Sequence, residues 1–204
     1  MKQASALTVP LRLVTLVAIT FVGACSVLPQ PNRYELYQLA PSSLNTQGST
    51  LEADSLQIRA PRTDDLTRTN RVVVRQQGQR LSAWSGIRWV SPAPELWRDQ
   101  LLDALHNTGA FHTLGTPGAN LNTDLELTGH LRAFHLDQTQ DPPQAVIRFD
   151  AQLTGQHQGG IQATRRFEVT ETLTANTPAS AATAMSAATD RMAEQLLDWM
   201  ESID

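Results

Sequence analysis

The sequence predicts an α+β fold, in which a mainly antiparallel sheet carries two amphipathic helices packed on one face. Three observations support this prediction. The chain has 204 residues, of which 41% are hydrophobic, and these values are typical of one packed globular domain. Several segments after residue 33 alternate apolar and polar side chains, as strands with one buried face do. Two further segments repeat apolar residues about every 3.6 positions, the helical period, so helices lying on one side of a sheet give the simplest assembly.

The first 24 residues are not expected to belong to this fold. Lys2 and Arg12 precede an uncharged stretch, 13–24, that is too short to cross about 30 Å of hydrocarbon as a helix. This stretch ends in Gly23 and Ala24, and small residues before a cysteine are what a lipoprotein-processing peptidase needs. Cys25 is the only cysteine, so the chain offers it no disulfide partner. We expect residues 1–24 to be a lipoprotein signal peptide and Cys25 to be the lipidation site.

Residues 25–33 are then expected to be the lipidated cysteine and its tether, and residues 34–204 the folded domain. Ser26 to Arg33 reach at most roughly 28 Å when fully extended, so the domain stays near the bilayer. Several acyl chains make a stable anchor, because each buried methylene contributes about 0.8 kcal/mol. A residue other than Asp after the cysteine favours the outer membrane of a Gram-negative envelope. Ser26 therefore indicates an outer-membrane anchor facing the periplasm, with the inner membrane as the less favoured location.

The first half of the domain alternates short strand patterns with polar loops. Residues 41–54 form a polar loop with little to bury, and Gln77 to Gln79 form a turn. Leu96 to Leu105 have helical spacing, with helix-compatible prolines before them and Gly109 as the stop signal. Strands are expected at 34–39, 55–60, 71–75, 81–84 and 87–90.

The second half predicts longer strands and a final helix. Residues 121–136 carry an apolar set that changes phase, as a bulge near residue 133 would require. The segments 147–153 and 161–169 form a hairpin across the turn at 156–160. Thr177 and Pro178 open a helix whose apolar side chains recur to Ile203.

The sequence contains no recognisable catalytic motif. It lacks a Gly-x-Ser-x-Gly elbow, a His-Glu-x-x-His pair, a glycine-rich phosphate loop and a second cysteine. His130 and His135 lie five positions apart on one predicted strand, so we expect their side chains on opposite faces, where they cannot share a metal. We therefore expect no enzyme, no cofactor and no metal site; a lipoprotein hydrolase is the third and least favoured hypothesis.

Charge is unevenly distributed along the chain. Removal of Lys2 and Arg12 lowers the basic count from 16 to 14 and the net charge from −4 to −6, which argues against a nucleic-acid partner. Arginines concentrate in residues 59–88, whereas residues 168–204 are acidic. Two solvated faces would explain this pattern, and a polar docking surface for another envelope protein would explain it too. Tryptophan often anchors protein interfaces, and Trp84 is the tryptophan that we most expect to be exposed. The candidate partner-binding residues are Arg59, Arg62, Arg68, Arg71, Arg75 and Trp84.

The block from residue 56 to residue 105 resembles the ABC-type transport auxiliary lipoprotein family, of which paraquat-inducible protein C is a familiar member. The likeness extends over nearly the whole mature chain, but only this block is distinctive. Leu66 stands where the family commonly has an aromatic residue, so no subfamily is assigned. The matching segments are Leu56–Pro61, Asp65–Arg68, Arg71–Arg75, Arg80–Leu81 and Arg88–Pro92 ahead of an amphipathic helix.

The resemblance implies a non-catalytic, periplasm-facing component of an ABC transport system. Its implied partners are an MCE-domain periplasmic protein and the permease and ATPase of the transporter, and its implied task is lipid transport between membranes. The alternative is a structural or assembly lipoprotein of the outer membrane without an ABC partner. The sequence leaves open whether the chain forms an oligomer.

Overall fold

The computed structural model describes residues 33–45, 53–118, 123–155 and 160–203. Residues 34–204 form one compact unit. The predicted signal peptide, Cys25 and nearly all of the predicted tether lie outside the described residues, as do residues 46–52 of the predicted polar loop and residues 156–159 of the predicted hairpin turn.

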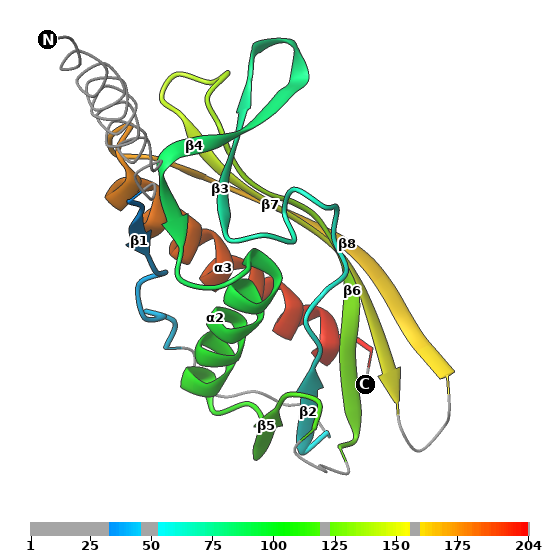
Figure 1. The fold of residues 1–204 in the computed structure, drawn as a ribbon. Coiled ribbons are helices and arrows are strands. Elements are labelled where there is room, and N and C mark those ends of the chain that lie inside the picture. The colour runs from blue at the N-terminus through cyan, green and yellow to red at the C-terminus, as the bar shows by residue number, and fades with distance from the viewer. Residues whose placement is uncertain (1–32, 46–52, 119–122, 156–159, 204) are drawn as a thin grey trace, which may run out of the picture. The chain divides into compact units, whose positions relative to one another are not determined.

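The described residues contain one sheet of eight strands and two α-helices (Figure 1). A short 3-10 turn, Gln77–Gln79, joins the third and fourth strands. The strands are β1 (Glu35–Tyr37), β2 (Ser55–Ile58), β3 (Arg71–Gln76), β4 (Arg80–Trp89), β5 (Thr113–Gly115), β6 (Leu125–Asp137), β7 (Gln144–Gly155) and β8 (Gly160–Thr172), and the helices are α2 (Ala93–Thr108) and α3 (Pro178–Glu201).

The sheet is built around β6. One edge of β6 pairs antiparallel with β7 along its whole length, and β7 pairs antiparallel with β8. The other edge is shared, because β2 pairs parallel with the start of β6 and β3 pairs parallel with its end. The short β5 adds to β2, and β4 and then β1 add to β3. The sheet is therefore mixed and mostly antiparallel, which confirms the predicted α+β class.

Both helices lie on the same side of the sheet (Figure 1). Trp97 of α2 is fully buried, and its ring centroid lies 4.7 Å from that of Phe149 on β7. Trp199 of α3 packs edge-on against Phe167 of β8 at 5.5 Å. These aromatic contacts fix both helices against the central strands, because each pair gains packing energy beyond its buried area.

The helix ends follow the predicted signals. Gly109 ends α2 in the left-handed conformation with a φ of 66°, which costs glycine little. The hydroxyl of Thr177 accepts a hydrogen bond of 3.3 Å from the backbone N–H of Ser180 at the start of α3.

Three expectations need correction. The predicted pair of strands at 81–84 and 87–90 is one strand, β4, which continues through Gly86 at a φ of 79°. The loop predicted to bury little contains Leu44, which is 7% exposed and joins the core. The loop is also hydrogen-bonded to α3, because the backbone N–H of Ser43 donates to the carboxylate of Asp190 at 2.8 Å.

The third correction concerns the histidines of β6. The predicted bulge is present, as the register with β7 shifts between Leu131 and Ala133. The extra residue reverses the side-chain phase, so His130 lies opposite Asp150 and His135 opposite Val146. Since Asp150 and Val146 share a face of β7, the two histidines share a face too.

Candidate docking surface

The face of β6, β7 and β8 that is turned away from the helices is lined with charged side chains, and we call it the open face. Ile147, Phe149 and Ala151 of β7 are buried in the core beneath the helices. Because successive side chains of a strand point to opposite sides, Arg148 and Asp150 lie on the open face. Arg166 and Glu168 of β8 join them, since they pair in register with Asp150 and Arg148.

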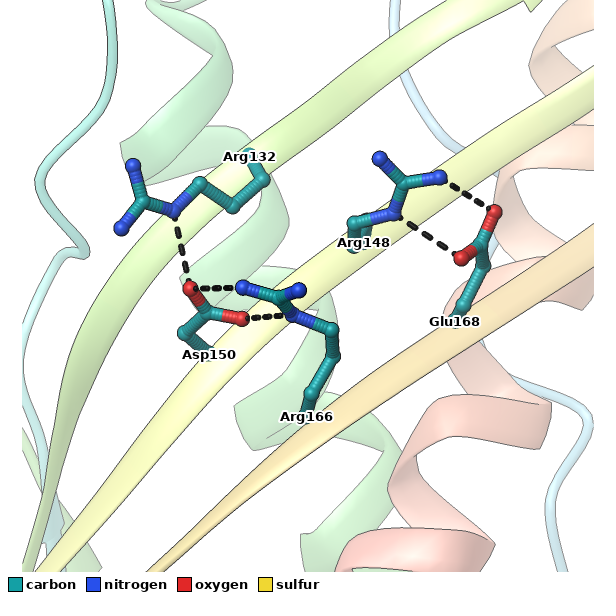
Figure 2. Close-up of polar contacts among 5 residues, drawn as sticks. All are labelled: Arg132, Arg148, Asp150, Arg166 and Glu168. Atoms are coloured by element: carbon teal, nitrogen blue, oxygen red, sulfur yellow. Dashed lines mark hydrogen bonds and ion pairs between the residues drawn. The ribbon is translucent and has the colours of Figure 1, made fainter.

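The charges of the open face are paired across strands (Figure 2). Asp150 accepts hydrogen bonds from Arg166, at 2.5 Å to Nε and 2.9 Å to Nη2, and from Nε of Arg132 at 2.8 Å. Glu168 accepts two from Arg148, at 2.9 and 2.7 Å. Two parallel bonds fix a guanidinium and a carboxylate in one plane, which is the strongest geometry for such a pair. The hydrogen bonds from Arg166 and Arg132 hold the pKa of Asp150 well below its ordinary value.

Two further pairs lie where β2 and β3 meet β6. Glu126 accepts hydrogen bonds of 2.9 and 2.5 Å from Arg59. Asp137, whose side chain is only 3% exposed, pairs with Arg75 and accepts bonds from the backbone and hydroxyl of Thr139. The hydrogen bond from Arg75 holds the pKa of Asp137 far below its ordinary value despite burial. Arg75 is therefore a structural partner of a buried carboxylate as well as a surface charge.

His135 lies on the same face among these arginines. Burial, together with the positive charges of Arg75 and Arg148, lowers its pKa to about 4, so its imidazole is neutral at pH 7. Burial also lowers the pKa of His130. Within the described parts of the chain, no three His, Cys, Asp or Glu side chains are placed to hold a metal ion.

The structure separates the six candidate residues predicted from the sequence. Arg59 and Arg75 lie at the margin of the open face in ion pairs. Arg62 and Arg68 instead line a pocket of ≈ 490 Å³, together with Glu95 and His130, between the segment after β2 and the start of α2.

The other two candidates lie apart from both groups. Arg71 is exposed and pairs in register with Arg88 of β4. Trp84, which we expected to be exposed, is half-buried and packs against the core. The arginines of residues 59–88 therefore do not form one site, because neighbours in sequence lie on different strands and loops and have different partners.

Sequence reasoning missed the centre of the open face, namely Arg132, Arg166 and Glu168. The signal was present, because the predicted hairpin of β7 and β8 implies a register, and that register places Arg148 opposite Glu168 and Asp150 opposite Arg166. The charge count of a segment does not reveal this pattern, because Arg148 and Asp150 of β7, like Arg166 and Glu168 of β8, alternate with side chains of the opposite face.

The arrangement is suited to binding rather than to catalysis. Its guanidinium and carboxylate groups neutralise one another and are held in fixed positions, so they can orient a partner of complementary charge with little rearrangement. None of the helices in the described residues is long and apolar enough to cross a membrane.

Sequence comparisons identify relatives over most of the domain. A family model described as ABC-type transport auxiliary lipoprotein component matches residues 37–196. The uncharacterized protein bll6063 of Bradyrhizobium diazoefficiens is 26% identical over 159 residues, which are 78% of this chain and 42% of that protein. This chain therefore spans less than half the length of that relative.

Solved structures share the fold. The crystal structure of protein XCC0632 from Xanthomonas campestris matches with a TM-score of 0.71 at 22% identity, over 83% of this chain and 96% of that one. A crystal structure of an uncharacterized protein matches with a TM-score of 0.65 at 16% identity, over 82% of this chain and 98% of that one. At such identities the likeness establishes the fold alone.

Proposed function

Because this chain belongs to the ABC-type transport auxiliary lipoprotein component family, we propose that it is the membrane-anchored, periplasm-facing auxiliary lipoprotein of an MCE-type transport system that moves lipids between membranes. The match of the family model over residues 37–196 is the observation that carries this proposal. The family description gives an auxiliary role in ABC-type transport. The MCE partner, the lipid cargo and the outer membrane are the finer parts of the proposal, and the resemblance in the block of residues 56–105 supports the first two.

In this proposal Cys25 carries the lipid and the tether that follows it sets the height of the domain. The sulfur of Cys25 is the only thiol of the chain, so it is the only position for a thioether-linked lipid. Ser26, rather than Asp, favours sorting to the outer membrane. Substitution of Cys25 by Ala is expected to release the chain from the membrane fraction, whereas a variant that remains membrane-bound would contradict this role.

We assign docking on the MCE-domain protein to the open face. Its paired charges project from three long strands that the helices support from behind, so they form a rigid polar surface. Charges of this kind set orientation and encounter rate more than affinity. Arg132 is the best probe of this surface, because its side chain is 49% exposed and Asp150 keeps its bidentate partner Arg166 when Arg132 is changed.

Co-purification tests the proposal. An affinity-tagged copy of the chain, extracted from the envelope in mild detergent, is expected to bring down an MCE-domain protein with an ATPase and a permease. The Arg132→Glu variant should lose most of this yield, while Arg80→Glu, at the tip of the β3–β4 hairpin, should not. A clean preparation of the chain without transporter subunits would contradict the function, and equal yields from both variants would contradict the face.

A further inference from the structure

A second surface, at the opposite edge of the sheet from β8, carries exposed apolar side chains. Among the described residues, the large hydrophobic side chains that are exposed are Tyr34 at 42%, Leu36 at 64%, Leu81 at 47%, Val90 at 50% and Ile161 at 61%. Leu81 and Ile161 lie apart, opposite Arg75 and Thr154 respectively. The other three are brought together by the pairing of β1 with β4.

The strand register places these three side chains on one face. Glu35 and Tyr37 of β1 pair with Ile87 and Trp89, which are buried in the core. Leu36 pairs with Arg88 between them, so both side chains point away from the core.

Val90 and Tyr34 extend the same face at its two ends. The backbone N–H of Val90 donates to the carbonyl of Tyr37 at 2.9 Å, which continues the alternation, so Val90 lies on the side of Arg88. The guanidinium of Arg88 lies 4.4 Å from the ring centroid of Tyr34, which places this ring beside Arg88 too. We call Tyr34, Leu36 and Val90 the β1 apolar face.

Basic side chains border the β1 apolar face. Arg88 lies within it, and Arg71 pairs in register with Arg88 on the neighbouring strand. Glu35, the carboxylate of β1, accepts a hydrogen bond of 3.1 Å from the hydroxyl of Tyr37. A tyrosine and aliphatic side chains flanked by arginines are the composition found at the boundary of a bilayer, where the ring lies at headgroup level and guanidinium groups meet lipid phosphates.

The position of this face in the chain determines its occupant. Tyr34 is separated from Cys25 by only the eight residues 26–33, which reach at most roughly 28 Å. We infer that the β1 apolar face lies against the phospholipid surface to which Cys25 is attached. This inference depends on the lipid anchor of the proposed function. Three side chains give weak binding on their own, but the anchor holds them at a high effective concentration near the surface. The domain thus meets the membrane by one edge, with β8 at the far edge of the sheet.

Site-specific labelling tests this inference in the lipidated, full mature chain. We would introduce single cysteines as Leu36→Cys and Val90→Cys and attach an environment-sensitive fluorophore. Ile161→Cys is the matched control, because Ile161 is 61% exposed against 64% for Leu36 but lies on the opposite edge strand. The sulfur of Cys25 is blocked by its lipid, so the introduced thiol is the only one that reacts.

The labelled proteins are then placed in vesicles of phosphatidylethanolamine and phosphatidylglycerol that contain a lipid-borne quencher. Labels at 36 and 90 are expected to lose most of their fluorescence, while the label at 161 keeps most of its own. Quenching at 36 and 90 no stronger than at 161 would overturn the inference while leaving the anchor intact. If the labels at 36 and 90 become shielded from solvent only when envelope proteins are added, the face binds a protein partner, and the inference is overturned as well. A second reactive thiol at Cys25, with the chain left in solution, would refute the anchor itself.

Discussion

Arg75→Ala should destabilise the domain more than any other substitution of an open-face arginine. Removing this guanidinium leaves Asp137 with a side chain that is 3% exposed and only Thr139 as a hydrogen-bonding partner. Breaking a fully buried ion pair costs about 3–5 kcal/mol; since Arg75 is 30% exposed, water can replace part of its contribution, and we expect about 2–3 kcal/mol. This is a large share of the roughly 5–15 kcal/mol that stabilises a typical domain.

Urea denaturation followed by circular dichroism measures this change, and Arg148→Ala is the matched control. Arg148 also pairs with a carboxylate of the open face, but both side chains are exposed, at 40% and 46%, so its loss should cost less than about 1 kcal/mol. The native pKa of Asp137 lies below the ordinary 3.8, so its pair contributes fully above that pH and less as pH falls through the native pKa. The Arg75→Ala deficit should therefore shrink on acidification. Equal costs for the two variants, or a deficit that does not change with pH, would refute this reasoning.

Three further predictions concern the strands and helices that support the open face. Gly129→Ala should lower the free energy of unfolding by about 2–4 kcal/mol, because an added Cβ would lie 2.2 Å from the carbonyl oxygen of Asp150. Gly160 has the same φ of 156° but open space around it, so Gly160→Ala is the control for this clash. Urea denaturation should show a smaller loss for Gly160→Ala, and equal losses for the two variants would refute the clash. His135 has a native pKa of about 4 against an ordinary 6.5, so between these pH values the unfolded state binds a proton that the native state does not. The free energy of unfolding should therefore fall by up to ~3 kcal/mol as the pH drops from 6.5 to 4. His135→Gln should remove this pH dependence, and an unchanged profile of stability against pH would contradict the prediction. Thr177→Ala should cost about 1 kcal/mol through loss of the α3 cap, and an unchanged denaturation midpoint would contradict that role.

The elements that could be predicted are those with strong local signals. The hairpin of β7 and β8, the bulge of β6 and both helices follow from side-chain periodicity and from capping residues such as Thr177 and Gly109. These signals are local because each depends on a few neighbouring residues. The sharing of one edge of β6 by two separate strands could not be predicted, since it depends on parallel pairs that are distant in sequence and only two or three residues long.

The charged surface was harder to predict than the strands that carry it. Arg71 and Arg75 lie on the same short strand, yet Arg75 pairs with a buried carboxylate and Arg71 lies beside Arg88. The partners of each arginine come from other strands, so its role depends on register and not on its sequence neighbours. The half-buried position of Trp84 and the burial of Leu44 have the same cause, because both side chains meet core residues that tertiary packing brings to them.

Cross-linking from the open face in living cells tests the central claim most directly. A photoreactive amino acid would replace Thr164, which is exposed on β8 and lies in register with Gln152, and a control would replace Thr183, which is exposed on α3 on the helical side. We predict that Thr164 yields a cross-link to an MCE-domain periplasmic subunit and that Thr183 does not. The same partners from both positions, or no transporter subunit from Thr164, would contradict docking through the open face.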